Sequence, residues 1–448
     1  MKLFGSSGIR GKYGSFLSTD LALRLGKSLG VLGYRTVVVG RDTRMSGETL
    51  CHSLLAGLLS SGCEVTELGI LPTPVLCYAT RFLERDCGVM ITASHNPAED
   101  NGLKLWNKDG FAFSPANESQ VEALILEGEF LELSWNQLGH LSTNREVSMD
   151  YLQTLHSHFT LNGRGRILLD AGNGAAFQLS PEALRDFGYD VVEVSCDGDG
   201  TFPGRNPEPT VQTLRETARR VVNEGCQLGF CHDGDADRMV AIDDQGRVVD
   251  LDKFLVVLAR ELVKSTGIRR IVTTVDASML VEYVLDDVEI IRTAVGDVFV
   301  AQALVEQSAA FGGEPCGAYI FPSHGLWPDG VFAMFQILDI LQQLDRPLSL
   351  LLDELPNYPM IRDKVSCSRE QKEEAMECIA QHLPEARSIN TIDGIRAEYG
   401  THAVLIRPSG TEDLIRLNLE ADSEERLEEE AQSFRKIVKE AVEEVTLV

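Results

Sequence analysis

The sequence has no apolar run long enough to span a membrane. Its 448 residues contain no stretch of about 18 consecutive apolar residues, the length that a transmembrane helix requires. The start of the chain also lacks the apolar core of a signal peptide. We therefore expect a cytoplasmic protein with no membrane partner.

Positive charge is scarce as well. The chain has 41 Lys and Arg residues against 68 Asp and Glu residues, which gives a formal net charge of −27. Such an acidic chain repels nucleic acids and anionic membranes, so we expect neither as a partner. An anionic substrate would need a local group of basic side chains.

Cysteine pairs with metal or redox spacing are absent too. Of the ten cysteines, Cys226 and Cys231 come nearest to a CxxC spacing without forming one. In a long chain without secretory features, reduced and mostly buried thiols are the expected state. The hydrophobic content of 44% is that of a globular protein, and the length corresponds to about three or four domains.

A strand, a loop and a helix recur three times along the chain, beginning near Thr36, Arg166 and Arg270. This alternation is typical of βαβ units. The faint repetition indicates related α/β domains in tandem. The second copy lacks the third glycine of a dinucleotide-binding fingerprint, so we interpret it as a simple strand-to-helix turn.

The first candidate site follows a buried strand. The apolar run Cys87–Ile91 predicts a strand, and Asn96-Pro97 predicts a turn. Ser94 and His95 should therefore lie at the carboxyl end of a strand, where open α/β sheets place their chemistry. An ordinary turn with a helix-capping serine would explain this stretch alone equally well. The next residues, Asp100-Asn101-Gly102, predict a hairpin-type turn.

The second candidate site is an acidic loop between two apolar strands. Asp233, Asp235 and Asp237 alternate with small residues. Carboxylates this close repel one another unless a divalent cation lies among them. The flanking strands, and Arg238 in place of the required glycine, exclude an EF-hand. A metal site is favoured over a solvated acidic turn.

Three further loops suit sugars or anions. Phe4–Gly11 is rich in glycine and contains one arginine, although a loose terminus would explain it too. Phe311–Ile320 carries a glutamate that can accept hydrogen bonds from sugar hydroxyls. Val404–Arg416 combines hydroxyls, a glycine and two arginines, as a phosphate site requires. A plain loop and a surface turn are the alternatives for the last two.

Together these loops, in this order along the chain, resemble those of the α-D-phosphohexomutase family. Thr92–Pro97 resembles its phosphoserine loop, residues 233–238 its metal loop, Glu314–Gly317 its sugar loop and Arg407–Thr411 its phosphate loop. Within the family, the sequence is most similar to archaeal phosphoglucosamine mutases. Cys316 and Ala318 stand where many members have serine and histidine, which bears on the choice of sugar.

The resemblance implies three tandem related α/β domains and a distinct C-terminal α+β domain, in a heart-shaped molecule with a central cleft. The expected domains carry, in order, the phosphoserine, the metal, the sugar-recognition residues and the phosphate site. Their expected boundaries are residues 1–148, 149–248, 249–355 and 356–448.

The resemblance also implies interconversion of glucosamine 6-phosphate and glucosamine 1-phosphate through a phosphoserine and a 1,6-bisphosphate. Mannose or glucose phosphates are the alternative substrates, and a non-catalytic phosphosugar-binding protein is the alternative from another class. Mg²⁺ and an activating hexose 1,6-bisphosphate are the implied cofactors, and the protein should be a monomer or a homodimer.

Residue roles follow from the same resemblance. The implied catalytic residues are Ser94, His95, Lys104 and Arg10; the substrate-binding residues are Glu314, Cys316, Arg407, Ser409, Gly410, Thr411, Arg416 and Arg238; the metal ligands are Ser94, Asp233, Asp235 and Asp237. His95 and Lys104 both stay open as the proton acceptor. A serine hydrolase lacks a third group here, and a phosphatase with an aspartate nucleophile would leave Ser94 without a role. His324 could supply a further imidazole.

Overall fold

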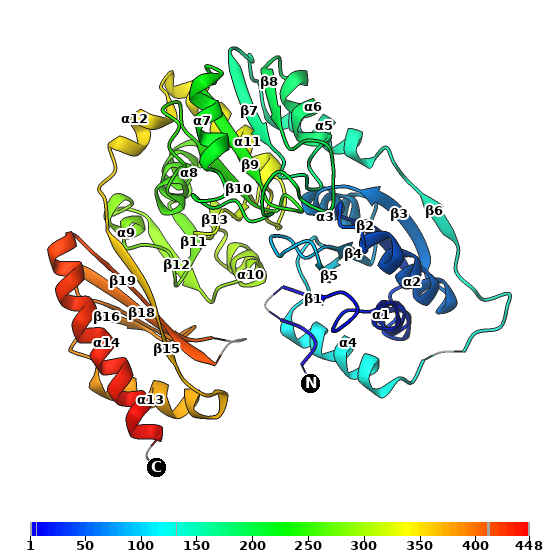
Figure 1. Ribbon diagram of the computed structural model, residues 1–448. Coiled ribbons are helices and arrows are strands. Elements are labelled where there is room, and N and C mark those ends of the chain that lie inside the picture. Colours follow the sequence, from blue (N-terminus) through cyan, green and yellow to red (C-terminus); the bar gives the residue numbers. More distant parts are fainter. Residues whose placement is uncertain (1, 6, 131, 410–412, 447–448) are drawn as a thin grey trace. The chain divides into compact units, whose positions relative to one another are not determined.

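The computed structural model describes residues 2–5, 7–130, 132–409 and 413–446. The chain divides into two compact units, each assembled from two segments (Figure 1). The first unit comprises Met1–Leu251 and Cys316–Leu352, and the second comprises Asp252–Pro315 and Asp353–Val448. Of the domains expected from the sequence, 1–148 and 149–248 fall in the first unit, 356–448 falls in the second, and 249–355 is divided between them. The four boundaries stay a prediction. Within the described ranges, no helix is both long and apolar enough to cross a membrane.

The first sheet of the first unit has six strands in the order β1-β5-β4-β2-β3-β6. Its strands are β1 (Ile9–Lys12), β2 (Thr36–Arg41), β3 (Glu64–Ile70), β4 (Cys87–Ile91), β5 (Asp100–Asn107) and β6 (Leu141–Thr143). β2 runs parallel to β3 and β4, whereas β5 is antiparallel to both β1 and β4. All five residues of β4 are buried, as an apolar run in a central strand should be.

Two expectations for this sheet are corrected. We expected a hairpin turn at Asp100–Gly102, but these residues begin β5. The glycine-rich start of the chain includes the edge strand β1, which pairs with β5. The pairing brings backbones close: a Cβ atom at Gly102 would lie 2.7 Å from the carbonyl oxygen of Ile9. Because Gly102 has no side chain, β1 and β5 can approach closely here, and Asp100-Asn101-Gly102 forms a strand although this sequence is typical of a turn.

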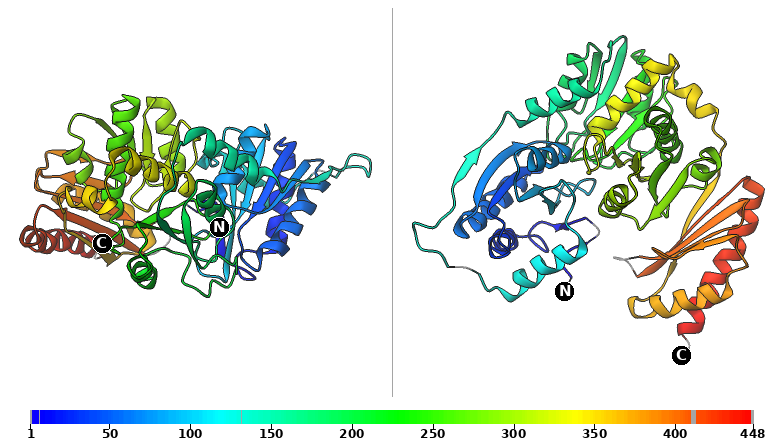
Figure 2. Two further views of the ribbon diagram at one scale, coloured as in Figure 1. Left: turned by 90° about the horizontal axis from the view of Figure 1, so that it is seen from above. Right: turned by 180° about the vertical axis from the view of Figure 1, so that it is seen from behind.

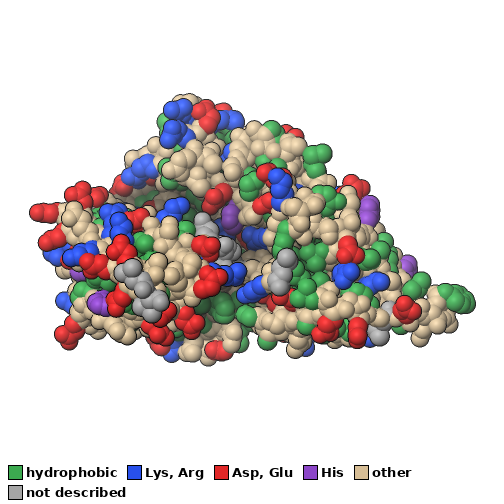
Figure 3. Space-filling model, turned by 60° about the horizontal axis from the view of Figure 1, so that its bottom comes forward, with side chains coloured by type: hydrophobic (Ala, Val, Ile, Leu, Met, Phe, Trp, Pro, Cys, Tyr) green, Lys and Arg blue, Asp and Glu red, His purple; other side chains and the backbone are tan. Residues whose placement is uncertain are grey.

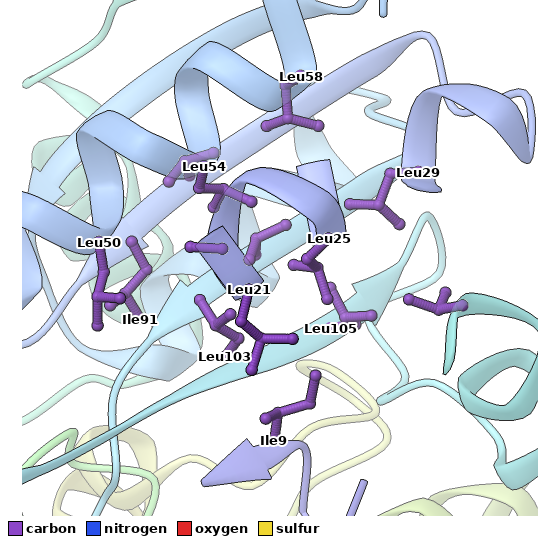
Figure 4. Close-up of a cluster of buried hydrophobic side chains, with 14 of the residues drawn as sticks. Ile9, Leu21, Leu25, Leu29, Leu50, Leu54, Leu58, Ile91, Leu103 and Leu105 are labelled. Atoms are coloured by element: carbon purple, nitrogen blue, oxygen red, sulfur yellow. The ribbon is translucent and has the colours of Figure 1, made fainter. Parts of the chain in front are cut away.

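Helices cover this sheet and form its core. They are α1 (Thr19–Val31), α2 (Gly47–Ser60), α3 (Thr73–Phe82) and α4 (Pro115–Glu127). The Ser18 hydroxyl accepts the Leu21 N–H at the start of α1, as an N-cap does. Leucines spaced three or four residues apart on α1 and α2 point toward one another and toward the sheet (Figure 4).

The second sheet of the first unit has four strands in the order β10-β9-β7-β8. Its strands are β7 (Arg166–Asp170), β8 (Asp190–Val194), β9 (Leu228–His232) and β10 (Met239–Ile242); the accompanying helices are α5 (Val147–His158), α6 (Leu179–Asp186) and α7 (Arg215–Asn223). β7 is parallel to its two neighbours, and β9 and β10 form an antiparallel pair. The acidic loop connects this last pair. The elements β14 (Tyr319–Ile320) and α11 (Gly330–Leu344) also belong to this unit, and α12 (Leu348–Asp353) reaches its end.

The second unit contains a parallel sheet and an antiparallel sheet. The first has β11 (Arg270–Thr274), β12 (Glu289–Thr293) and β13 (Phe311–Gly313), with helices α8 (Leu251–Thr266), α9 (Leu280–Val284) and α10 (Asp297–Gln307). The second has the order β15-β19-β18-β17-β16. It comprises β15 (Met360–Ser366), β16 (Ser388–Asn390), β17 (Ile395–Glu398), β18 (His402–Pro408) and β19 (Leu414–Ala421), with the short 3₁₀ helix η1 (Arg369–Gln371), α13 (Lys372–His382) and α14 (Glu424–Thr446).

The spacing of apolar residues in 423–448 predicts a C-terminal helix with one apolar face packed against the last domain's sheet, and the structure agrees. Leu427, Ala431, Phe434, Val438 and Ala441 of α14 are buried in the core of the antiparallel sheet. α13 and α14 lie on the same face of this sheet (Figure 2). The expected fold class is therefore confirmed: mixed and parallel α/β sheets precede a distinct C-terminal antiparallel sheet with helices.

Charge is spread over the molecular surface. Figure 3 shows acidic side chains distributed over the drawn face, with basic side chains among them. Seven of the ten cysteines are buried, and all ten are free thiols. The expectation of reduced, mostly buried cysteines agrees with this arrangement.

The close contact of α1 and α2 yields a stability prediction. A Cβ atom at Gly26 would lie 2.6 Å from the Leu54 carbonyl oxygen and 2.8 Å from the Leu58 nitrogen. Gly26→Ala should therefore lower the free energy of unfolding by about 1–3 kcal/mol through overpacking, although alanine favours helices by about 1 kcal/mol. Calorimetric unfolding measures the change. Exposed His52→Ala on α2 is the control and should be nearly neutral; a stabilised Gly26→Ala protein would contradict the prediction.

Candidate active site

Ser94 follows β4 on a buried loop of the first unit. Its backbone is left-handed, with φ of 51°, a conformation that costs a residue other than glycine about 1–3 kcal/mol. Its hydroxyl donates a hydrogen bond of 2.6 Å to Oδ2 of Asp233. Nδ1 of His95 lies 3.3 Å from the same hydroxyl oxygen. The structure thus places Ser94 beside both the acidic loop and an imidazole.

The acidic loop places three buried carboxylates together. Asp233, Asp235 and Asp237 each offer a ligand oxygen, and these oxygens lie within 4.8 Å of one another. They follow β9, and the loop is compact because Ala236 adopts a left-handed conformation with φ of 57°. The predicted metal ligands, including the Ser94 hydroxyl, are therefore brought to one place.

Lys104 of β5 contacts two of these carboxylates. Its ammonium donates to Oδ2 of Asp235 at 2.7 Å and to Oδ2 of Asp237 at 2.8 Å. The other oxygen of each carboxylate, Oδ1, is buried and has no hydrogen-bond partner among the described residues. A hard divalent cation takes such oxygens as ligands, so the donor set fits one.

The pKa shifts of Asp233 and Asp235 are consistent with a cation site in the acidic loop. Burial and the neighbouring carboxylates raise the pKa of Asp233 well above its usual value. Burial alone would raise the pKa of Asp235 too, but the ion pair with Lys104 outweighs it and leaves that pKa below the usual range. Lys104 therefore keeps the pKa of Asp235 low, whereas the pKa of Asp233 stays raised by burial and by the other two carboxylates.

The two candidate proton acceptors differ in charge. Burial lowers the pKa of Lys104, but its contacts with Asp235 and Asp237 outweigh burial and raise that pKa above the ordinary value. Burial, together with the charges of Arg238, Arg10 and Lys104, lowers the pKa of His95 to about 3. The imidazole is therefore neutral near pH 7, whereas the ammonium keeps its proton.

Two arginines lie beside the acidic cluster. Arg10 on β1 donates to the Ser7 hydroxyl at 2.8 Å. Burial lowers the pKa of its guanidinium, although the nearby Asp235 and Asp237 act to raise it. The backbone N–H of Arg238 donates to Oδ1 of Asp233 at 3.3 Å, and its Nε lies 3.9 Å from Oδ1 of Asp237. Both guanidinium groups thus lie close enough to the loops to lower the pKa of His95, the residue after Ser94.

The predicted sugar loop crosses the boundary between the units, and each part is described with its own unit. In the second unit, Glu314 is buried and accepts the Gly296 N–H at 3.0 Å. In the first unit, Cys316 is partly exposed. The next residue, Gly317, accepts the Met239 N–H at 3.0 Å, so Cys316 lies near the end of the acidic loop.

The predicted phosphate loop lies between β18 and β19 of the second unit. Arg407 forms a two-point ion pair with Asp393, with Nε 3.1 Å from Oδ1 and a terminal nitrogen 2.7 Å from Oδ2. Arg416 is the cross-strand partner of Arg407. The Ser409 carbonyl accepts the Lys372 ammonium at 2.7 Å. Gly410 and Thr411 lie outside the described residues.

His324 lies in the interior of the first unit. Its Nε2 is 3.1 Å from Oδ2 of Asp329, and the Tyr151 hydroxyl donates to the same carboxylate at 2.9 Å. The ring stacks on Phe332 with centroids 4.3 Å apart. Asp329 also caps α11. His324 therefore contributes to the packing of α11 and orients its cap.

Four residues that touch these sites were not predicted from the sequence. Thr73 donates to Asp235 at 2.6 Å, Arg44 binds the carbonyls of the Ser94 loop, Arg205 binds the carbonyl before Asp233, and Asp393 binds Arg407. Arg44 comes shortly after the end of β2, just as Ser94 comes shortly after the end of β4. Because open α/β sheets place their chemistry at the carboxyl ends of strands, this position could have indicated Arg44. Arg205 and Asp393 lie in irregular segments with no such signal.

Comparison with known proteins gives the family. Sequence profiles of the phosphoglucomutase/phosphomannomutase family match residues 1–132 (domain I), 149–246 (domain II), 250–358 (domain III) and 364–437 (C-terminal domain). The phosphoglucosamine mutase of Methanocaldococcus jannaschii is 41% identical, with 98% of this chain and 99% of that protein covered. A Methanothermobacter thermautotrophicus protein named "Probable phosphoglucosamine mutase" is 44% identical over 95% of each chain.

A solved structure agrees with these sequence matches. A phosphoglucomutase/phosphomannomutase family protein from Burkholderia thailandensis superposes with a TM-score of 0.89 at 26% identity, over 98% of this chain and 97% of that one. The matched domains span the chain in order, and the relatives match it over nearly their full length. The chain belongs to the phosphoglucomutase/phosphomannomutase family of mutases.

Proposed function

We propose that this mutase interconverts glucosamine 6-phosphate and glucosamine 1-phosphate through a phosphoserine at residue 94 and a 1,6-bisphosphate intermediate. The observation that carries the proposal is the 2.6 Å hydrogen bond from the Ser94 hydroxyl to Asp233, within a cluster of buried carboxylates. A serine in this setting lies beside a divalent-cation site and a neutral imidazole. Such a setting suits phosphoryl transfer to and from its oxygen.

The choice of glucosamine rests on the relatives. Proteins 41% and 44% identical to this chain over nearly its whole length are named as phosphoglucosamine mutases. Cys316 and Ala318 occupy positions where many family members have serine and histidine, so mannose or glucose phosphate stays the second candidate. Glu314 is our candidate for binding the ring hydroxyls, because its carboxylate is buried on a glycine-rich loop.

The first half-reaction transfers the phosphoryl group from Ser94 to the sugar. A hydroxyl of the bound monophosphate forms a new P–O bond as the bond between phosphorus and the Ser94 oxygen breaks. The hydroxyl proton passes to a base. Arg10, Arg238 and Lys104 would hold the transferring group, since all three are cationic and surround the acidic loop. The product is the hexose 1,6-bisphosphate.

The second half-reaction returns a phosphoryl group to Ser94. The bisphosphate turns over, the Ser94 oxygen attacks the other phosphorus, and the leaving sugar oxygen takes a proton. Asp233, Asp235, Asp237 and the Ser94 oxygen would hold Mg²⁺, which, when bound, neutralises charge developing on the serine oxygen. Arg407, Ser409 and Arg416, with Gly410 and Thr411 of the same loop, would bind the phosphate that does not react.

We assign the proton transfer to His95. Its Nδ1 lies 3.3 Å from the Ser94 oxygen. Burial and the nearby cations lower the pKa of the ring to about 3, so its acceptor nitrogen is unprotonated near pH 7. Lys104 retains its proton through its contacts with Asp235 and Asp237. These two observations favour the His95 imidazole over the Lys104 ammonium as the base.

The remaining expectations belong to the same proposal. They are four domains at residues 1–148, 149–248, 249–355 and 356–448, activation by a hexose 1,6-bisphosphate, a monomer or homodimer, a phosphorylated hexose or hexosamine as the partner, and a cytoplasmic location.

Ser94→Ala tests the phosphoserine. Removal of the oxygen that carries the phosphoryl group should lower kcat by about ten-thousand-fold or more. Intact-protein mass spectrometry should show that a phosphate present on the wild-type protein is lost. Ser157→Ala on the exposed side of α5 is the control and should keep both the rate and the phosphate. A Ser94→Ala enzyme with a near-normal rate would refute the role.

Asp235→Asn tests the metal site. Loss of one carboxylate charge should raise the Mg²⁺ concentration for half-maximal rate by about 10–100-fold, the range seen when metal-site partners are removed. Titrating Mg²⁺ against the steady-state rate measures the shift. Exposed Asp109→Asn carries the same chemical change outside the cluster and should not move the curve. An unchanged curve for Asp235→Asn would exclude it as a ligand.

A substrate panel tests the sugar. Phosphorylated wild-type protein is given the 1- and 6-phosphates of glucosamine, mannose and glucose, with Mg²⁺ and the matching bisphosphate. We expect kcat/KM for glucosamine phosphates to exceed the others by at least about tenfold, the discrimination available from one polar group. Equal or better use of mannose or glucose phosphates would overturn the assignment of the sugar. No turnover of any of them would favour a phosphosugar-binding protein.

A further inference from the structure

We propose that buried Arg44, paired with Asp42, is the positioning residue of the Ser94 loop, and that Arg205, paired with Asp170, positions the acidic loop separately. Neither arginine reaches a substrate in this account; each acts through backbone carbonyls. The inference rests on the proposed function, in which Ser94 carries phosphate and the acidic loop holds the cation.

Arg44 donates hydrogen bonds to three carbonyl oxygens of the Ser94 loop and to the carbonyl of Asp100, the first residue of β5. One terminal nitrogen donates to Ser94 at 2.9 Å and to Asn96 at 2.6 Å. The other donates to Asp100 at 2.8 Å and to Pro97. The Arg44 side chain is 0% exposed, so the guanidinium is fully buried. A planar group with five donors can satisfy several carbonyls at once.

Asp42 completes the same network from the other side of the loop. Its carboxylate accepts Nε of Arg44 at 3.0 Å and the Thr92 hydroxyl at 2.7 Å. The Thr92 oxygen in turn accepts the Ser94 N–H at 2.8 Å. Both backbone polar groups of Ser94 are therefore bound, directly or through Thr92, to the Arg44–Asp42 pair.

This arrangement accounts for the backbone conformation of Ser94. A left-handed serine persists only where its surroundings over-determine it. The contact from Arg44 to its carbonyl and the contact from Thr92 to its N–H supply that constraint, and they direct the hydroxyl toward Asp233. The guanidinium is also packed against the ring of Phe202, 5.0 Å from its centroid. Lysine cannot reproduce the fork, because its single nitrogen cannot span four carbonyls.

Arg205 makes a smaller set of contacts of the same kind at the start of the acidic loop. Its Nε lies 3.0 Å from Oδ2 of Asp170, and a terminal nitrogen donates at 2.6 Å to the carbonyl of His232, the residue before Asp233. The other terminal nitrogen donates to Asn206 at 3.1 Å. Asp170 ends β7 much as Asp42 follows β2. The two pairs use the same chemistry on different loops, so their effects can be separated.

Arg44→Lys and Arg205→Lys form a matched pair of variants. Both keep the charge and lose the fork. With the best sugar phosphate from the panel and saturating Mg²⁺, Arg44→Lys should lower kcat by about a hundredfold, the cost of a small misplacement of a reacting atom. Its KM and its half-saturating Mg²⁺ concentration should stay within twofold, as expected if only the reacting atom has moved. Arg205→Lys should raise that Mg²⁺ concentration by about tenfold and regain most of the wild-type kcat once Mg²⁺ is saturating.

A general structural role would show itself differently. If both variants lost kcat and Mg²⁺ affinity alike, in proportion to their loss of thermal stability, the separate positioning roles would be excluded. The ³¹P resonance of the phosphoserine gives an independent readout: it should shift in Arg44→Lys at saturating Mg²⁺ and match the wild-type protein in Arg205→Lys. Identical spectra for wild type and Arg44→Lys would also overturn the proposal.

Thr92→Val keeps the proposal testable if Arg44→Lys does not fold. It removes the hydroxyl between Asp42 and the Ser94 N–H without removing a buried charge. We expect kcat to fall by at least about tenfold with KM unchanged, because only the placement of the reacting oxygen has changed. An unchanged kcat would overturn the inference. Failure of the proposed function is a distinct result, since it would appear as full activity in Ser94→Ala.

Discussion

The mutual repulsion of three buried carboxylates is the constraint on which the site of the first unit depends. Asp233, Asp235 and Asp237 could not share a volume with ligand oxygens within 4.8 Å of one another without opposing charge. Lys104 supplies part of that opposing charge, and its ammonium binds one oxygen of Asp235 and one of Asp237. The oxygens left over face a place that a divalent cation fits. Burial and the same repulsion together raise the pKa of Asp233.

Close backbone contacts make the cluster possible. The loops that carry Ser94 and Asp233 approach each other at Gly234, where a side chain would collide with the Ser94 carbonyl. A Cβ atom at Gly174 would likewise lie 2.6 Å from the Gly234 carbonyl. Carbonyls packed this densely need donors, and buried arginines provide them because one guanidinium binds several oxygens. Hydrogen bonds to the backbone carbonyls therefore fix the conformation of the functional loops, and the loop conformation places the acidic side chains.

Much of this arrangement could be predicted from the sequence, for physical reasons that also explain the misses. The run Cys87–Ile91 and the stripe on α14 have periodicities that burial imposes, so both elements were correctly expected. The three aspartates predict a metal site from the sequence alone, because like charges so close together are costly without a cation. The contacts of Arg205 depend on a fold that brings distant segments together, and no local pattern records them. The turn expected at Asp100–Gly102 was wrong because tertiary pairing with β1 outweighs local turn propensity.

In the second unit, a series of hydrogen bonds connects Glu314 with Arg407, two proposed recognition residues that are far apart in the sequence. The Gly296 N–H binds Glu314, the preceding Val295 N–H binds Asp393 at 3.1 Å, and Asp393 binds Arg407. This chain of contacts joins the carboxylate proposed for the sugar to the guanidinium proposed for the phosphate. Arg407 faces Arg416 across the sheet, a repulsive pair of like charges that Asp393 offsets. A phosphate dianion would offset the same repulsion more completely, which is why two facing arginines in an acidic chain suit a phosphate site.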